Sequence, residues 1–282
     1  LDAGGPEDQV EARLTATSGE ALATIVYTSG TTGVPKGVML SHRGFVHQLE
    51  VLTRSLNIRP EDSSLCFLPL SHALERAWTF VVLCCGALNT YVPDPKTVAD
   101  QLVLAQPTLL VSVPRLYEKV YSTARERVAG SAVKRRIMAW SLRVGAEYHR
   151  AAIAGRRASS SIRARYRLAD RLVLSNIRTA MGGPKAVLAC GGAPLRQEIE
   201  EFFLACGLLV LQGYGLTEAS PLVSFPSPQA YRFGTVGQVI EGAQVRLTDE
   251  GEICYRGPNL MLGYWGQPEA TDEVLRDGWL HT

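Results

Sequence analysis

The sequence predicts an α/β fold in which helices flank mostly parallel β-sheets. Two observations support this prediction: the spacing of short apolar runs, and the helical patterns that follow them. Short apolar runs recur along the chain, and each is followed by a turn and then by a helical pattern. Such a series is typical of βαβ units, which form parallel sheets. The chain has 282 residues and is 46% hydrophobic, so it is also long enough to bury a sizeable core.

The expected strands end in glycine-rich loops. Apolar runs at 21–27, 186–190 and 208–211 each lead directly into such a loop, and a further run at 109–113 is closed by Pro114. In parallel sheets, ligands bind beyond the carboxyl ends of the strands. We therefore expect the three glycine loops to face one pocket.

Helices are expected after several of these strands. Ser41 is a suitable N-cap, and residues 115–128 have a helical pattern. Pro194 is expected to open another helix, which Gly207 ends. The apolar stripes of the first and last of these helices are Phe45, Leu49, Leu52 and Leu56, and Leu195, Ile199, Phe202 and Phe203.

The pattern changes after about residue 225. Short alternating segments broken by glycines and acidic turns predict a small antiparallel sheet or part of a barrel. The expected organisation is therefore an α/β core at 1–225 and an incomplete, β-rich, barrel-like subdomain at 226–282.

A basic segment at 125–185 interrupts the core, with about fifteen Lys or Arg residues against about three acidic ones. A helical stripe of Ile137, Trp140, Val144 and Tyr148 favours a solvated amphipathic hairpin. Attachment to an anionic membrane surface is the alternative that stays open. The net charge of only +2 and the lack of a groove-reading motif predict no nucleic-acid partner.

Composition excludes several classes of protein. The apolar stretch from Trp78 to Leu88 is too short to span a bilayer and is interpreted as buried core. None of the six cysteines forms a C-x-x-C pair, and Cys84 and Cys85 lie in that apolar stretch. These features predict reduced core cysteines in a cytoplasmic protein, and no Cys and His cluster in the sequence suggests a zinc site.

The segment YTSGTTGVPKG, from Tyr27 to Gly37, combines glycines, hydroxyls and a lysine directly behind a strand. Glycines let backbone N–H groups approach a phosphate, and hydroxyls add donors to its oxygens. Lys36 adds a compact positive charge. The loop differs from a Walker A motif, but it predicts a phosphate site.

A second element follows the strand at 208–211. In YGLTE, Tyr214 offers a flat face to a purine base, and Thr217 offers a hydroxyl to a phosphate. Glu218 offers the hard oxygen ligand that Mg²⁺ prefers. Together with the segment from Tyr27 to Gly37, which we call the hydroxyl loop, this element predicts a nucleotide site.

Four segments resemble the ordered motifs of the adenylate-forming enzymes, namely YTSGTTGVPKG, GGAPL, QGYGLTE and GEICYRGPNLMLGYW. This family contains acyl-CoA synthetases, luciferases and peptide-synthetase adenylation domains. LPLSHALER at 68–76 and DGWLHT at 277–282 resemble the fatty-acyl-CoA synthetase branch, and VPRLYEK at 113–119 its bacterial long-chain members.

The resemblance implies ATP-dependent activation of a long-chain fatty acid to an acyl-adenylate, followed by transfer to CoA. Lys36, Thr217, Glu218 and His72 are the implied catalytic residues, and Thr28 and Glu218 the Mg²⁺-binding positions. His72, Tyr117 and Gly215 are the implied acyl-site residues, with Tyr117 as an aromatic gate. The implied nucleotide-binding positions are Thr28, Ser29, Gly30, Thr31, Thr32, Gly33, Lys36, Gly192, Ala193, Pro194, Gln212, Gly213, Tyr214, Gly215 and Thr217.

Alternatives stay open for these assignments. His72 could be a packed histidine beside Leu70, and Tyr117 a plain core tyrosine. The acceptor could be a carrier protein instead of CoA, or the chain could be a non-catalytic nucleotide-binding or membrane-associated module. The family pattern continues beyond Thr282, so we expect this chain to be a central fragment with little activity by itself. A homodimer is a further possibility.

Overall fold

The structure is a computed structural model, and it describes residues 7–28, 35–227 and 230–282. Internal contacts divide the chain into two units. Unit 1 comprises 1–48, 217–220 and 242–282, and unit 2 comprises 49–216 and 221–241. The predicted domain boundary at residue 225 stays a prediction.

Unit 2 is built on a five-stranded sheet with the order β4-β3-β5-β6-β7. Every recorded pair of neighbouring strands in it is parallel, as the sequence predicts. The strands are β3 (Ser63–Cys66), β4 (Leu88–Tyr91), β5 (Leu109–Ser112), β6 (Val187–Cys190) and β7 (Val210–Gln212). The central strands β5 and β6 are buried along their whole length, which explains their continuous apolar sequences.

The side chains of β5 and β6 alternate between two separate cores, one on each face of the sheet. Leu110 and Leu188 join one core, while Leu109 and Val187 join the other. Successive side chains of a strand point to opposite faces, so both faces need a covering layer. The helices α5 (Pro114–Ala129) and α9 (Gln197–Ala205) contribute to the first core, and α3 (Ala73–Cys84) contributes to the second.

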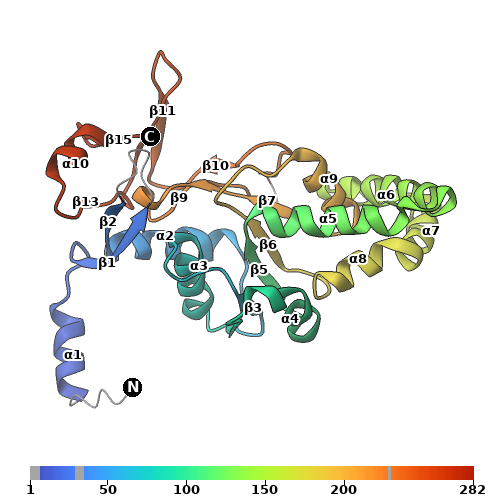
Figure 1. Cartoon of the computed structure of the whole chain (residues 1–282), viewed down its shortest axis with the longest axis horizontal. Coiled ribbons are helices and arrows are strands. Elements are labelled where there is room, and N and C mark those ends of the chain that lie inside the picture. Colours follow the sequence, from blue (N-terminus) through green and yellow to red (C-terminus); the bar gives the residue numbers. More distant parts are fainter. Residues whose placement is uncertain (1–6, 29–34, 228–229) are drawn as a thin grey trace. The chain divides into compact units, whose positions relative to one another are not determined.

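The remaining elements of unit 2 lie around this sheet (Figure 1). Helix α4 (Val98–Ala105) packs into the first core, and a small antiparallel sheet has the order β10-β9-β8. Its strands are β8 (Tyr214–Gly215), β9 (Leu222–Phe225) and β10 (Gln238–Val239).

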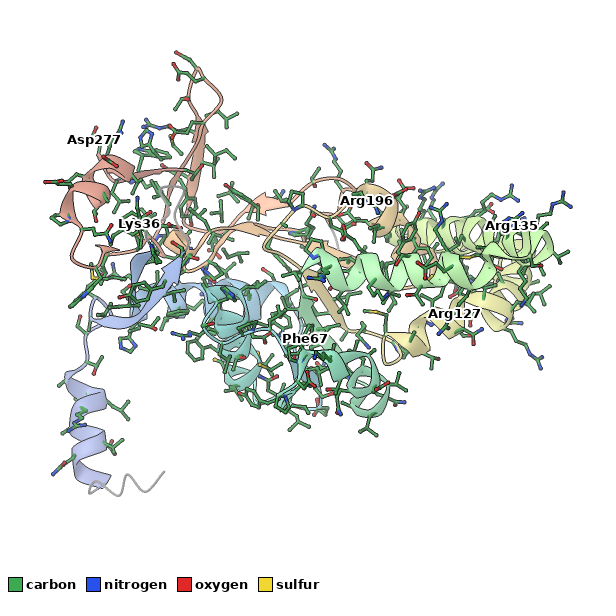
Figure 2. The ribbon with its side chains drawn as sticks, in the orientation of Figure 1. Lys36, Phe67, Arg127, Arg135, Arg196 and Asp277 are labelled. Carbon is green, nitrogen blue, oxygen red and sulfur yellow. The ribbon has the colours of Figure 1, made fainter. Side chains whose placement is uncertain are left out.

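The basic segment forms α6 (Ala132–Ile153), α7 (Ser160–Ala169), a π-helical stretch (Asp170–Leu174) and α8 (Ser175–Ala180). Arg127 and Arg135 of this segment, labelled in Figure 2, are both exposed. No helix in the described part of the chain is long and apolar enough to cross a membrane.

The predicted stripe on α6 is offset from the buried one. Ile137 is 38% exposed, whereas Met138, Ser141, Val144 and Gly145 are buried. A Cβ added at Gly145 would lie 2.1 Å from the carbonyl oxygen of Ala205, so α6 approaches α9 at backbone distance there. Small residues make this contact, and a search for apolar periodicity overlooks them.

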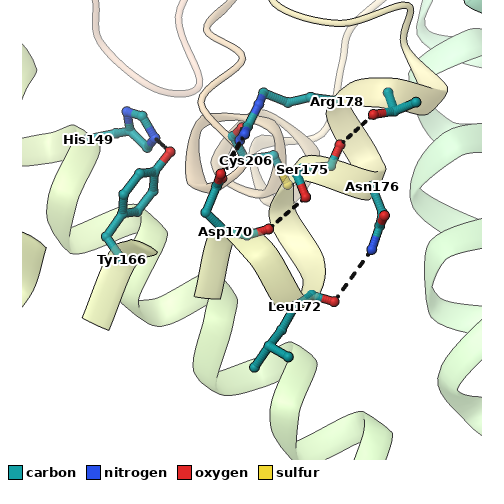
Figure 3. A network of polar contacts seen from close by, with 9 residues as sticks. His149, Tyr166, Asp170, Leu172, Ser175, Asn176, Arg178 and Cys206 are labelled. Atoms are coloured by element: carbon teal, nitrogen blue, oxygen red, sulfur yellow. Dashed lines mark hydrogen bonds and ion pairs between the residues drawn. The ribbon is translucent and has the colours of Figure 1, made fainter. Parts of the chain in front are cut away.

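Polar contacts surround the π-helical stretch between α7 and α8 (Figure 3). Arg178 forms an ion pair with Asp170 at 2.7 Å and donates to the carbonyl oxygen of Cys206 at 2.9 Å. His149 contacts the Tyr166 hydroxyl at 3.1 Å. Burial, together with the charge of Arg178, lowers the pKa of His149 to about 4, so His149 is neutral near pH 7.

Unit 1 contains α1 (Glu7–Ala16) and an antiparallel hairpin, β1 (Leu22–Thr28) and β2 (Lys36–Ser41), to which β13 (Gly263–Tyr264) adds. The predicted N-cap is confirmed, because the Ser41 hydroxyl accepts from the Gly44 amide at 3.2 Å and α2 (His42–Ser55) begins there. A second antiparallel sheet has the order β11-β12-β15-β14, as the late alternating segments predict. Its elements are β11 (Gln244–Leu247), β12 (Ile253–Arg256), β14 (Leu275–Arg276) and β15 (Trp279–His281), with α10 (Pro268–Val274) beside them.

Three expectations from the sequence are wrong. The loop after Tyr27 belongs to an antiparallel hairpin in unit 1, so it does not end a strand of the parallel sheet. Helix α9 begins at Gln197 instead of Pro194, because the Leu195 amide donates to the Gln212 side chain. The stretch from Trp78 to Leu88 is only partly core, since Phe80, Leu83, Cys84 and Leu88 are exposed.

Candidate active site

The hydroxyl loop is described only at its two ends. Thr28 and Lys36 are directly paired across β1 and β2, so the hairpin brings the ends of the loop together. Both residues are half-buried. The predicted phosphate contacts of Ser29, Gly30, Thr31, Thr32 and Gly33 lie outside the described residues.

Within unit 1, a single turn of 3₁₀ helix carries Thr217, Glu218 and Ala219. The backbone of this turn is fixed from two sides. The Met261 amide donates to the carbonyl oxygen of Glu218 at 2.8 Å, and the Gln48 side-chain amide donates to that of Ala219 at 2.9 Å. The position of the Glu218 carboxylate therefore depends on segments far away in the sequence.

Asn259 is the fully buried anchor of the same turn. Its side-chain NH₂ donates to the carbonyl oxygen of Ala219, and its side-chain oxygen accepts from the Tyr255 hydroxyl at 2.6 Å. Its backbone carbonyl accepts from the Ser220 hydroxyl at 2.8 Å. Ser220 has a φ of 58°, so these contacts hold a backbone conformation that serine seldom adopts.

Tyr264 links two of the predicted catalytic residues, both of which lie in unit 1. Its hydroxyl donates to Oε1 of Glu218 at 2.9 Å, and Lys36 Nζ lies 4.9 Å from the centroid of its ring. Burial raises the pKa of Tyr264, and the charge of Glu218 and the hydrogen bond to it add to that rise. Tyr264 therefore stays protonated and keeps donating to Glu218 near neutral pH.

The residues present fit a divalent cation at Glu218. One carboxylate oxygen is held by Tyr264, and among the described residues no donor occupies Oε2. A half-buried carboxylate that is fixed by one hydrogen bond and open at its other oxygen is a suitable hard ligand for Mg²⁺.

In unit 2, the loops predicted to bind adenine follow the neighbouring strands β6 and β7. The Gly213 amide donates to the carbonyl oxygen of Cys190 at 2.8 Å, and the buried Gln212 side chain accepts from the Leu195 amide. Gln212 therefore ties one loop to the other. Gly192, Ala193 and Pro194 are exposed and Tyr214 is half-buried, so these residues remain accessible to a ligand.

Gly215 occupies a position that only glycine fits. A Cβ there would lie 1.8 Å from the carbonyl oxygen of Pro221. The Leu216 amide donates to that same oxygen at 2.8 Å, which closes the connection between β8 and β9. The role of this glycine in the structure is to allow close backbone approach.

The two predicted acyl-site residues differ in accessibility. His72 precedes α3 and is exposed, so the alternative of a packed histidine is wrong. Tyr117 is fully buried, packs edge-on against Phe203 and donates to the carbonyl oxygen of Ala189 at 2.6 Å. This placement fits the alternative of a core tyrosine, and the gate stays a prediction.

Close to His72 in the sequence, Glu75 is a buried carboxyl in the first turn of α3. Burial raises its pKa from the usual 4.5 to about 7, although the Leu68 amide donates to it at 3.2 Å. The native state therefore binds a proton that the unfolded state releases near pH 4.5. The stability that this proton provides is complete below pH 4.5 and is lost as the pH rises through 7.

We expect Glu75→Gln to become steadily more stable relative to the unmodified protein between pH 4.5 and 8. The difference between pKa values of 4.5 and about 7 corresponds to roughly 3 kcal/mol. Urea unfolding of both proteins across this range measures the change, and the comparison cancels the other titrating groups. A pH-independent difference would show that Glu75 titrates normally.

The five-stranded parallel sheet and the motif-bearing loops give the chain the fold of the adenylate-forming enzymes that its motifs resemble. Residues 2–265 match the family model described as AMP-binding enzyme. The chain belongs to this family.

Curated relatives of known name are similar to this chain in sequence. The chain is 37% identical over its whole length to the long-chain fatty-acid–CoA ligase FadD15 of Mycobacterium bovis, of which it covers 47%. It is 31% identical to a chloroplastic long-chain fatty-acid–[acyl-carrier-protein] ligase of Arabidopsis thaliana, with 92% of the chain and 41% of that protein covered. The chain therefore spans about half the length of the curated relatives that it matches.

Solved structures share the fold. Apo MatB from Rhodopseudomonas palustris matches with a TM-score of 0.66 at 26% identity, covering 94% of this chain and 45% of that one. A double mutant of o-succinylbenzoate CoA synthetase from Bacillus subtilis matches with a TM-score of 0.66 at 21% identity, covering 94% and 46%. The second likeness supports the fold alone.

Proposed function

We propose that this protein is an AMP-forming long-chain fatty-acid–CoA ligase. The fatty carboxylate attacks the α-phosphorus of ATP, and the bond to pyrophosphate breaks. The CoA thiolate then attacks the carbonyl carbon of the acyl-adenylate, and the bond to AMP breaks. The observation that carries the proposal is the fixed arrangement of Lys36 and Glu218 around Tyr264, in a chain 37% identical to a ligase of this kind.

The phosphate chemistry is assigned to unit 1. The fatty acid needs no general base, since its carboxyl is ionised at pH 7. The protein positions the reacting carboxylate and ATP, and it neutralises the charge of the phosphates. Lys36, with the hydroxyl loop that precedes it, neutralises the departing pyrophosphate, and Thr217 meets the α-phosphate. Glu218 and Thr28 would hold Mg²⁺, which supplies further charge neutralisation when bound.

The adenine and acyl contacts are assigned to unit 2. Gly192, Ala193 and Pro194 are accessible beside the strand end, and Tyr214 offers its ring to the base. The exposed His72 is assigned to the carbonyl of the acyl-adenylate. Tyr117 is assigned to the acyl gate, a role that requires its side chain to leave the core.

Two assignments concern the surroundings of the enzyme. The arginines of the basic segment, such as Arg127 and Arg135, would contact an anionic membrane surface from the cytoplasm. The cytoplasm is assigned because none of the six cysteines forms a C-x-x-C pair in the sequence. A homodimer is included in the proposal and is tested by the mass in solution.

A carrier protein is the competing acceptor. One relative, at 31% identity, is named as a ligase for acyl-carrier protein. The distinction concerns only the second step, because both kinds of enzyme form the same acyl-adenylate.

The proposal is tested with protein expressed from its complete gene. Pyrophosphate release from ATP is measured with fatty acids of eight to eighteen carbons, with and without CoA. We expect sustained release that requires both CoA and a long chain. A single burst that CoA does not prolong would favour the carrier protein, and no release with any acid would favour the non-catalytic alternative.

A further inference from the structure

Unit 1 contains a cluster of Glu252, Cys254 and His281 that the sequence does not reveal. Cys254 lies in β12 and His281 in β15, where the two residues are direct cross-strand partners. Directly paired residues share one face of a sheet, and residues two apart on a strand do so as well. The antiparallel pairing therefore brings the three side chains together on one face.

The distances within the cluster are short. Nδ1 of His281 lies 2.8 Å from Oε2 of Glu252 and 3.4 Å from Sγ of Cys254. One ligand atom from each residue lies within 4.8 Å of the other two. Zinc bonds of about 2.0–2.3 Å at tetrahedral angles separate neighbouring ligand atoms by roughly 3.3–3.6 Å. Small side-chain adjustments therefore suffice to surround one ion.

The backbone around the cluster is already fixed. The Glu252 amide donates to the Thr248 hydroxyl at 3.2 Å, and the Thr248 amide donates to the carbonyl oxygen of Glu252 at 3.0 Å. On the other strand, the Thr282 amide donates to the carbonyl oxygen of Ile253 at 3.2 Å. Ligands that are held in place before binding lose little conformational entropy when the ion binds.

The cluster is partly buried, and a positively charged residue lies on the neighbouring strand. Cys254 is fully buried, whereas the side chains of His281 and Glu252 are 16% and 38% exposed, so solvent reaches the open side of the cluster. Arg246 lies directly opposite Cys254 on β11. Its guanidinium carbon lies 4.4 Å from the centroid of the Trp279 ring, so Arg246 forms a cation–π contact with that ring.

We propose that Glu252, Cys254 and His281 form a zinc-binding site that clamps β12 to β15. Thiolate, imidazole and carboxylate together favour Zn²⁺ over Mg²⁺ or Ca²⁺, which prefer oxygen ligands alone. The three side chains leave a fourth position for water. Binding displaces the thiol proton of Cys254 to solvent, because the thiolate is the ligand. None of the three side chains is assigned a part in the ligase chemistry, so the proposal stands apart from that function.

The test is a titration of the purified, metal-free protein with Co²⁺, which reports thiolate ligation by a charge-transfer band in the near ultraviolet. We expect one equivalent to bind with this band, and Zn²⁺ to displace it. Cys254→Ser should remove the band, while the matched variant Cys84→Ser, at an exposed cysteine, should retain it. Glu252→Gln preserves the shape of the side chain and should weaken binding at least about tenfold.

The alternative is a hydrogen-bonded cluster without an ion. A band that survives in Cys254→Ser, or is lost in Cys84→Ser, would overturn the site. So would the absence of a band in the unmodified protein. If Cys254→Ser does not fold, unchanged Co²⁺ affinity in folded Glu252→Gln overturns the proposal by itself. The melting temperature should also rise with Zn²⁺ in the unmodified protein.

Discussion

Replacement of Glu218 by glutamine is expected to lower fatty-acid-dependent ATP turnover by at least about a hundredfold. A metal ion at the reacting phosphates supplies several kcal/mol of charge stabilisation, and each 1.36 kcal/mol changes the rate about tenfold. Glutamine removes the charge but still offers an oxygen to the Tyr264 hydroxyl, which donates to Glu218 at 2.9 Å. The turn should therefore keep its shape, and the loss should appear in turnover at saturating ATP.

A matched control separates this effect from a general change of charge. Glu269 is an exposed glutamate in the first turn of α10, and Glu269→Gln should turn over ATP at the unmodified rate. The Mg²⁺ dependence is the decisive readout, since Glu218→Gln should need more Mg²⁺ for half-maximal turnover. Near-normal turnover with an unchanged Mg²⁺ requirement would remove Glu218 from the metal site.

Replacement of Asn259 by alanine is expected to lower the free energy of unfolding by about 2–4 kcal/mol. The change leaves the buried Tyr255 hydroxyl without its acceptor and takes one of two amide donors from the carbonyl oxygen of Ala219. Each buried polar group that loses its partner costs about 1–3 kcal/mol. Urea unfolding followed by circular dichroism measures the loss.

Asn176 provides the comparison for this variant. It is exposed, and its side chain makes one long hydrogen bond of 3.4 Å to the carbonyl oxygen of Leu172. Asn176→Ala should therefore cost less than about 0.5 kcal/mol. Equal losses from both asparagine variants would mean that Asn259 does not anchor the Thr217–Ala219 turn.

The parallel sheet of unit 2 follows from the sequence for a clear physical reason. Strands that are buried on both faces have continuous apolar sequences, and β5 and β6 are of this kind. An apolar run does not identify its partner strand, however. The sequence of β1 is also an apolar run, but β1 pairs with β2, on the other side of the hydroxyl loop, in an antiparallel hairpin. The apolar run alone does not predict this hairpin.

Chain separation explains what the sequence did not reveal about the sites. Glu218 and Tyr264 are far apart in the chain and meet because the segment before Tyr264 bonds to the Glu218 turn, through the Met261 amide, while β13 pairs with β2. Cys254 and His281 likewise meet only through the register of β12 and β15. The YGLTE motif identifies Glu218 as a candidate ligand, but local sequence cannot show which side chain holds it.

The most direct measurement is the exchange of labelled pyrophosphate into ATP, using protein from the complete gene with a long-chain fatty acid and no CoA. This exchange reports reversible formation of the acyl-adenylate alone, so it does not depend on the final acceptor. The account predicts exchange that requires the fatty acid and Mg²⁺ and that Lys36→Ala abolishes. Folded protein that binds ATP but shows no exchange with any fatty acid, or exchange that survives in Lys36→Ala, would contradict it.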